Sequence, residues 1–148
     1  MFIIGIDPGV KTGVAIWCTD DQKFYDIQTT TILEAMTIVN DCRAHQDVIL
    51  IVEDARQRKW YGDNAAAKRM GAGSIKRDCK VWEEYAELNQ VPCIMQHPKR
   101  GSTKLDAKTF KSITRYQGRT SEHARDAAMM VYKLSENQAR ILIEANKD

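Results

Sequence analysis

Residues 2–17 read FIIGIDPGVKTGVAIW, and this stretch sets the expected fold. Two apolar runs rich in β-branched residues flank a short turn of Pro, Gly, Lys and Thr, which is the pattern of two strands joined as an antiparallel hairpin. Asp7 lies where the first strand stops being apolar. A carboxylate there costs free energy unless it is hydrogen-bonded, paired or bound to a metal. Asp-Pro-Gly is also good turn chemistry, so Asp7 is either a turn residue or part of a site.

The composition is that of an ordinary globular protein. The chain has 148 residues, of which 43% are hydrophobic and 28% charged, and its net charge is +2. This predicts one domain over residues 1–148 with a core of its own. The four cysteines form no C-x-x-C pair, and no apolar stretch approaches the length of a membrane span. We expect a cytoplasmic protein with reduced thiols, no signal peptide and no membrane partner.

Periodicity and turn residues predict the strands of the sheet. Residues 23–29 alternate weakly, as an edge strand would, and 48–52 form the most hydrophobic β-branched run, which is typical of a central strand. A further short strand is expected at 91–95. The order of elements predicts an α/β fold, with a mixed sheet whose first three strands are antiparallel and whose later strands are parallel and joined by helices.

Apolar spacing and capping residues predict the helices. A first helix is expected near 32–44. The others are a helical turn at 65–70 that stops at Gly71 and Gly73, a helix over 74–90, a helix over 107–117 capped by Asp106 and closed by Gly118, and a final helix that starts after Thr120 or Ser121 and breaks near Asn137.

Four side chains are predicted to converge at one edge of this sheet. Asp7 ends the first strand and Glu53 ends the central strand, and the carboxyl ends of parallel strands meet at the same edge. His123 and Asp126 lie three residues apart and share one face of the final helix. Small residues would let that helix approach the sheet closely, namely Ala124, Ala127 and Ala128.

Such a cluster is a candidate metal site. Three carboxylates raise one another's pKa and need a counter-charge, and hard oxygen ligands favour magnesium or manganese over zinc. Two such ions about 3.5–4 Å apart can activate water and stabilise the leaving oxygen of a phosphodiester. Structural roles stay open for each residue: Glu53 facing water, His123 donating to a backbone carbonyl, and Asp126 paired with Arg125 or Arg119.

Two segments have the composition of a nucleic-acid surface. From His97 to Arg119 basic residues exceed acidic ones, and positions 104, 108, 111 and 115 are spaced as a helical stripe that can follow phosphates. The basic residues are Lys99, Arg100, Lys104, Lys108, Lys111, Arg115 and Arg119. The segment after Glu53 adds residues that can stack on unpaired bases or bind phosphates: Arg56, Arg58, Lys59, Trp60 and Tyr61. The alternatives are a solvated helix face and a Trp60 that anchors the loop or lies in a dimer interface.

These motifs, in this order, resemble the RuvC-type Holliday junction resolvases of the RNase H-like superfamily. Four stretches carry the resemblance: the hairpin with GIDPG at 5–9 and GVA at 13–15, the apolar strand ending in Glu53, GAG at 71–73 before a long helix and Val91-Pro92, and the H-x-x-D-A motif at 123–127. The resemblance extends from Phe2 to about Tyr132.

The resemblance implies an RNase H-like fold and a homodimer that cuts four-way DNA junctions symmetrically with magnesium or manganese. It implies that the metal-binding catalytic residues are Asp7, Glu53, His123 and Asp126. Asp54 does not match this set and is either a bystander or shares the ion. The chain is short for a cellular resolvase, which favours a phage or prophage relative.

Other functions remain open at this point. A nuclease of the same superfamily that acts on RNA or on replication forks would use the same residues, because fold does not fix substrate. A non-catalytic DNA-binding module of the same fold is another alternative. An actin-like ATPase shares the D-x-G hairpin, but the chain is too short for its two lobes. A two-fold dimer would supply two equivalent sites, and the expected interface is the helix around Trp82, Tyr85 and Leu88.

Overall fold

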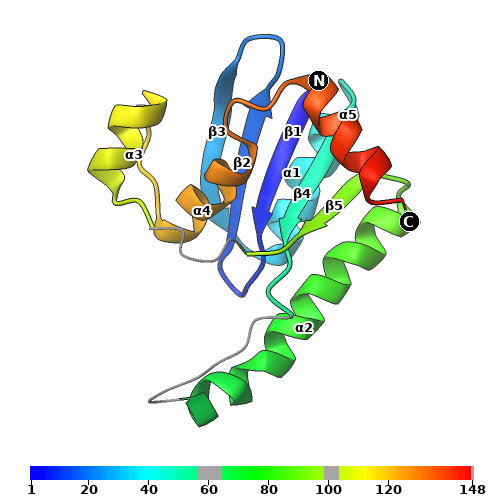
Figure 1. Cartoon of the computed structure of the whole chain (residues 1–148), viewed down its shortest axis with the longest axis vertical. Coiled ribbons are helices and arrows are strands. Elements are labelled where there is room, and N and C mark those ends of the chain that lie inside the picture. Colours follow the sequence, from blue (N-terminus) through cyan, green and yellow to red (C-terminus); the bar gives the residue numbers. More distant parts are fainter. Residues whose placement is uncertain (57–64, 99–103, 148) are drawn as a thin grey trace.

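The computed structural model describes residues 1–56, 65–98 and 104–147. These residues form a mixed five-stranded sheet with helices packed on both faces (Figure 1). The strands are β1 (Phe2–Asp7), β2 (Thr12–Cys18), β3 (Lys23–Thr30), β4 (Val48–Glu53) and β5 (Cys93–Gln96). The helices are α1 (Ile32–Arg43), α2 (Ala65–Leu88), α3 (Ala107–Thr114), α4 (Glu122–Val131) and α5 (Glu136–Ala145).

The strand order is β3-β2-β1-β4-β5. The pairs β1–β2 and β2–β3 are antiparallel, whereas β1–β4 and β4–β5 are parallel. The predicted α/β class and the predicted strand directions are therefore confirmed. Because Ile6 is paired with Val52, the residues that follow them, Asp7 and Glu53, end neighbouring strands at the same edge of the sheet.

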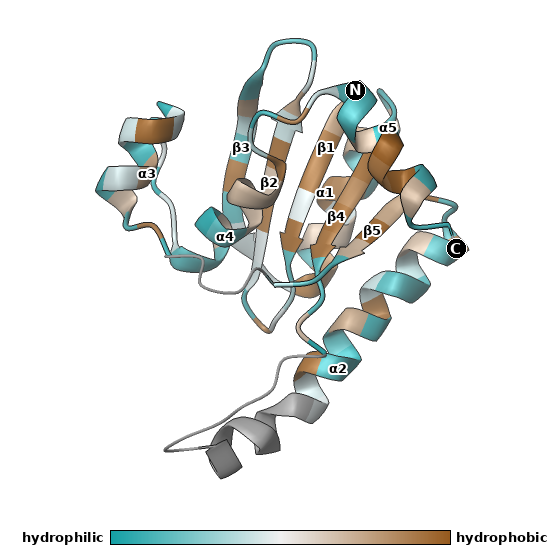
Figure 2. Ribbon diagram, in the orientation of Figure 1, coloured by the Kyte–Doolittle hydropathy of each residue, from teal (hydrophilic) through white to brown (hydrophobic). Residues whose placement is uncertain are grey.

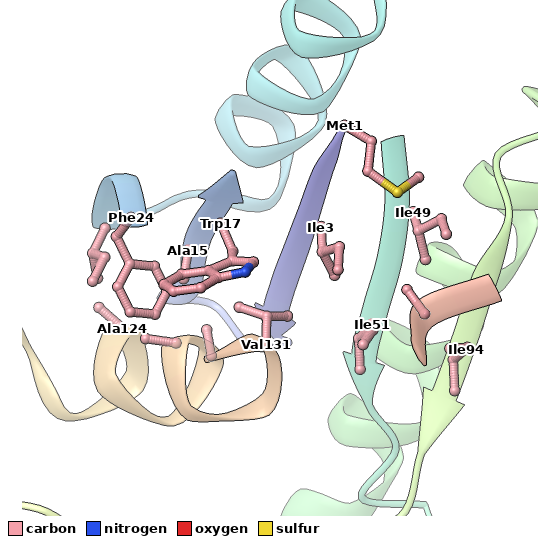
Figure 3. Packing of buried hydrophobic residues seen from close by; sticks show 14 of the residues in the cluster. Met1, Ile3, Ala15, Trp17, Phe24, Ile49, Ile51, Ile94, Ala124 and Val131 are labelled. Atoms are coloured by element: carbon pink, nitrogen blue, oxygen red, sulfur yellow. The ribbon is translucent and has the colours of Figure 1, made fainter. Parts of the chain in front are cut away.

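Both faces of the sheet are buried, because β1 and β4 are apolar at successive positions and successive side chains point to opposite faces. One face packs against α4 and α5, with Ile3, Trp17 and Ile49 in the cluster (Figure 3). The other face packs against α1 and α2, with Ile4 and Leu50 in the cluster. Figure 2 shows the resulting pattern, with hydrophobic strands at the centre and hydrophilic residues on the outer helices.

The aromatic residues of α2 belong to this core. Trp82 is 0% exposed and Tyr85 is 8% exposed, and the Tyr85 hydroxyl donates to Asn40 Oδ1 at 2.5 Å. Trp82 and Tyr85 are therefore not available to the predicted dimer interface, because the helix turns these aromatic side chains toward the sheet. Leu88, at the end of α2, is 83% exposed.

Helix α2 is continuous from Ala65 to Leu88, so Gly71 and Gly73 do not interrupt it as predicted. A glycine inside a helix costs about 1 kcal/mol, whereas burying one large apolar side chain contributes about 1.5–3 kcal/mol. Cys79, Trp82 and Ala86 are buried against the sheet, and their burial outweighs the cost of the glycines.

The other helices begin at the predicted caps and differ at their ends. Asp106 caps α3 and Ser121 caps α4, each accepting a backbone N–H three residues later. Helix α3 ends at Thr114, because Arg115 adopts a left-handed conformation with φ 61°, and the expected closure at Gly118 is wrong. The chain breaks after Val131 and restarts as α5 behind Ser135, slightly before the predicted break. Within the described residues, no helix has the length and apolarity of a membrane span.

Candidate active site

Glycines in β1 and β2 let helix α4 cross the sheet at very short range. A Cβ atom on Gly5 would lie 2.2 Å from the Ala127 carbonyl oxygen, and one on Gly13 would lie 2.1 Å from the His123 carbonyl oxygen. On the helix side, Ala124 is completely buried at the crossing. The predicted close approach of the helix is therefore present, but the strand glycines are as necessary for it as the helix alanines. Glycine inside a strand is the sequence signal for such an approach, and Gly5 and Gly13 both carry it.

This crossing places the start of α4 next to the end of β1. His123 Nδ1 and Asp7 Oδ2 are hydrogen-bonded at 3.0 Å. The Asp7 side chain is 14% exposed, whereas that of His123 is 50% exposed. The imidazole therefore lies at the rim of the site, and the carboxylate lies at its base.

All three other predicted residues act on the Asp7 carboxyl group. Burial and the neighbouring Glu53 carboxylate raise the pKa of Asp7 to about 6, Asp126 adds to the increase, and His123 opposes it. The Glu53, His123 and Asp126 side chains, from β4 and α4, therefore lie near enough to Asp7 on β1 to affect its ionisation, and His123 contacts it directly. The metal-binding role of these four residues stays a prediction.

Asp126 forms an ion pair with Lys104, a residue predicted to belong to a DNA-binding helical stripe. Lys104 Nζ lies 3.5 Å from Asp126 Oδ2 and 2.5 Å from Glu122 Oε1. Lys104 precedes α3, so it is not part of a helical stripe. The predicted alternative pairing of Asp126 with Arg125 is wrong as well, because Arg125 donates to the carbonyl oxygens of Leu105 and Thr120. These bonds hold the segment that carries Lys104 beside α4.

The chemistry of these donors fits a hard divalent cation. The set offers three carboxylates and one imidazole, and burial of Asp7, together with the neighbouring Glu53 and Asp126 carboxylates, raises the pKa of Asp7. Among the residues that the structure describes, no three His, Cys, Asp or Glu side chains are already arranged as a metal-binding group. In this conformation Asp7 is bonded to His123 and Asp126 is paired with Lys104, so a cation would compete with both contacts.

The residues predicted to contact DNA have different positions. Lys108 and Lys111 are exposed and one turn apart on α3, whereas Arg115 ends that helix, so the predicted stripe of four is reduced to two helical residues. Arg119 is exposed in the segment before α4. Six of the predicted contacts lie outside the described residues, namely Arg58, Lys59, Trp60, Tyr61, Lys99 and Arg100.

Arg56 and Asp54 pair with each other. Arg56 Nε and Nη2 donate to the two Asp54 oxygens at 2.8 and 2.7 Å, and Nη1 donates to Glu83 at 2.5 Å. These bonds occupy the guanidinium group that we had predicted to bind DNA. They also explain Asp54, whose role the sequence left open: its carboxylate is the partner of Arg56.

The raised pKa of Asp7 predicts a pH-dependent stability. The folded protein holds the Asp7 proton up to about pH 6, whereas the ordinary pKa is 3.8, so this stabilisation is complete below about pH 4 and is lost as the pH rises through about 6. Asp7→Asn should therefore raise the free energy of unfolding at about pH 7.5 by on the order of 2 kcal/mol and change it little at about pH 4. Urea unfolding in a chelator at the two pH values measures this. An equal effect at both would contradict it.

Comparison with known proteins does not assign the chain to a family. No protein-family model matches it, and no curated protein matches it in sequence. The functional assignment therefore depends on the residues themselves and on their arrangement.

Proposed function

We propose that the protein is a divalent-metal-dependent endonuclease that cleaves branched DNA, with the four-way Holliday junction as its substrate. The observation that carries this proposal is the convergence of Glu53, His123 and Asp126 on the buried carboxyl group of Asp7. Ionising a buried carboxyl group whose pKa is raised by burial and by neighbouring carboxylates costs free energy without a cation. Magnesium and manganese are the cations that this donor set favours, and phosphodiester hydrolysis is the chemistry they support.

The fold is consistent with the proposed RNase H-like assignment. The sheet begins with three antiparallel strands and continues with parallel strands, as the resemblance to RuvC-type resolvases implies. The carboxylates lie at the carboxyl ends of β1 and β4, which is where α/β sheets bind ligands. Helix α4 supplies the third carboxylate from the motif that resembles the last motif of that family.

In this proposal the role of each residue follows from how exposed its side chain is. Asp7, Glu53, His123 and Asp126 would hold magnesium or manganese, which would supply activation of a water molecule and stabilisation of the leaving oxygen. Asp7 lies at the base, where its low exposure excludes water from its carboxylate. His123 lies at the rim, and the Asp7 hydrogen bond orients its ring. Nε2, the ring nitrogen that does not contact Asp7, is the one available either to bind the cation or to move a proton.

Helix α3 supplies exposed positive charge beyond the edge strand β3 (Figure 1). Phe110 anchors the helix to the core, and Tyr116 accepts the backbone N–H of Ile27 on the edge strand β3 at 3.3 Å. The anchored helix follows directly the segment in which Lys104 contacts Asp126. Lys108 and Lys111 are therefore the described side chains that we assign to phosphate binding, together with Arg115 and Arg119 beyond the helix.

Replacing both helical lysines should weaken DNA binding without changing the fold. Each lost phosphate contact reduces the slope of log affinity against log salt by about 0.9, so Lys108→Gln/Lys111→Gln should lower the slope by about 2. Gel-shift titration at several salt concentrations measures the slope. The control is Lys23→Gln/Lys147→Gln, which removes the same charge at residues that we do not assign to DNA binding. An unchanged slope in the α3 variant would remove α3 from the DNA surface.

The proposed activity is tested by incubating the purified protein with magnesium and four substrates: a four-way junction, a replication fork, a duplex and an RNA–DNA hybrid. We expect paired nicks placed symmetrically in the junction, and no cutting in a chelator. Preferred cutting of the hybrid or the fork would favour the other nuclease assignment. Binding without cleavage in any divalent metal would favour a non-catalytic DNA-binding module.

Symmetric cutting requires two active sites, so the proposal includes a homodimer. A closed two-fold arrangement gives both sites the same relation to the junction. Light scattering with and without junction DNA measures the mass of the species that binds. A monomer in the complex would contradict this part of the proposal.

A further inference from the structure

An ion-pair network joins the segment after β4 to helix α2. Asp54 accepts three hydrogen bonds from Arg56: from the backbone N–H at 3.1 Å, from Nε at 2.8 Å and from Nη2 at 2.7 Å. The third guanidinium nitrogen, Nη1, lies 2.5 Å from Glu83 Oε1 on α2. We call Asp54, Arg56 and Glu83 the Arg56 network.

The network depends on the shape of the guanidinium group. The Asp54 side chain is 9% exposed, and a carboxylate buried to this degree needs partners. Arginine binds it through two parallel N–H bonds and still has a third nitrogen for Glu83. The single ammonium of lysine cannot do both.

Glu53, a proposed metal ligand, lies directly beside the network. The next residue, Asp54, donates its backbone N–H to Gln96 on β5 at 2.7 Å. The carbonyl oxygen of Glu53 lies 3.8 Å from Sγ of Cys79 on α2. The backbone of Glu53 is therefore held between β5 and α2, and the Arg56 network is the ionic connection between its segment and α2.

Arg56, the central residue of this network, directly precedes a segment that we expect to contact DNA. Residues 57–64 follow Arg56 in the chain and lead into α2; they contain Trp60 and Tyr61 and lie outside the described residues. Figure 1 shows that α2 extends past the sheet on the side where β1 and β4 end.

We propose that Arg56 is a positioning residue, which orients Glu53 through Asp54 and α2 and thereby sets the affinity of the site for a divalent cation. The inference rests on the proposed function, because it takes Glu53 as a metal ligand. In this inference Arg56 orients a residue of the site and does not bind a DNA phosphate. Residues that hold metal ligands in place typically contribute about 10–100-fold to metal affinity or activity.

Arg56→Lys tests this inference because it keeps the positive charge but removes the guanidinium group that binds Asp54 through two nitrogens and Glu83 through the third. We expect Mn²⁺ to bind the DNA-free variant roughly 10-fold more weakly, and kcat for junction cleavage to fall by a similar factor, with KM for the junction within about twofold of the wild type. Mn²⁺ titration by calorimetry or electron paramagnetic resonance measures the first effect without any cleavage. Steady-state kinetics measure the second.

Arg140→Lys is the matched control. Arg140 also pairs with two carboxylates, Glu136 at 2.9 Å and Asp47 at 3.9 Å, but it lies on α5. This variant should bind Mn²⁺ and cleave junctions as the wild type does. A loss of the same size in both variants would show a general effect of weaker ion pairing and overturn the inference.

Glu83→Gln keeps the inference testable if Arg56→Lys folds poorly. It leaves the bidentate Asp54–Arg56 pair intact and removes only the charge on α2, so Mn²⁺ affinity should fall in the same direction by a smaller factor. Unchanged Mn²⁺ affinity in both variants overturns the inference. A raised KM with a smaller salt slope for Arg56→Lys also overturns it, because that result marks a phosphate contact.

The outcome for the wild type separates this inference from the proposed function. A wild type that binds Mn²⁺ and cuts no nucleic acid contradicts the nuclease assignment, and the Mn²⁺ titration of the variants then decides the role of Arg56. A wild type that neither binds Mn²⁺ nor cuts overturns both.

Discussion

Asp7→Asn is expected to lower junction cleavage by roughly 10³-fold or more while junction binding stays near the wild-type level. Asn has the same shape but no charge, so it cannot balance a divalent cation. Asp7 is also the residue to which Glu53, His123 and Asp126 are all electrostatically coupled. Its replacement therefore removes the centre of the site, whereas the basic residues assigned to DNA binding are unchanged.

Single-turnover cleavage and gel-shift binding in a chelator measure the two parts of this prediction. The matched control is Asp47→Asn, at an 84% exposed carboxylate just before β4, which should cleave normally. Because Asp7→Asn is also expected to be more stable near neutral pH, unfolding cannot explain its loss of activity. Cleavage by this variant within about tenfold of the wild type would rule out Asp7 as a catalytic residue and with it the assigned site.

Gly13→Ala is expected to be the most destabilising of the small substitutions considered for this protein. The new Cβ atom would lie 2.1 Å from the His123 carbonyl oxygen, 2.5 Å from its carbonyl carbon and 2.9 Å from the Ala124 nitrogen. All three are backbone atoms, so no side chain can rotate away. Overpacking of this kind costs about 1–3 kcal/mol or more, which lowers the melting temperature by roughly 3–10 °C in a protein of this size.

The same substitution should also reduce cleavage, because the strain is relieved by moving α4, and α4 carries His123 and Asp126. The control is Gly73→Ala in α2, where an added Cβ meets no atom within 4 Å. That variant should raise the melting temperature slightly, since alanine is favoured over glycine in a helix by about 1 kcal/mol. Calorimetric melting of both variants gives the comparison. A Gly13→Ala variant that melts with the wild type would contradict the close crossing of α4 over β2.

Much of the site follows from local patterns. Two uninterrupted apolar runs that end in Asp7 and Glu53 predict buried neighbouring strands, and the polar residue at each end comes to the same edge when the strands are parallel. Asp106 and Ser121 predict two helix starts because capping involves only the next three residues. The three-residue spacing of His123 and Asp126 predicts a shared helix face for the same reason.

Other features depend on residues far apart in the chain. Glycines do not break α2, because the sheet under its C-terminal half supplies packing that the local sequence does not show. The spacing of Lys104 from its neighbours predicts a helical charge stripe, but its partners are Glu122 and Asp126, about twenty residues later. Arg56 likewise pairs with Glu83, which lies 27 residues later in the chain.

By itself, the amino-acid sequence determined the α/β class, the hairpin and the side chains available for a metal site, because strand alternation, helix spacing and capping act over a few residues. Tertiary structure decided which cations are paired with which carboxylates and how closely α4 crosses β1 and β2. Those outcomes depend on long-range packing, in which a missing Cβ atom on Gly5 and Gly13 brings the start of a helix against two strands from the other end of the chain.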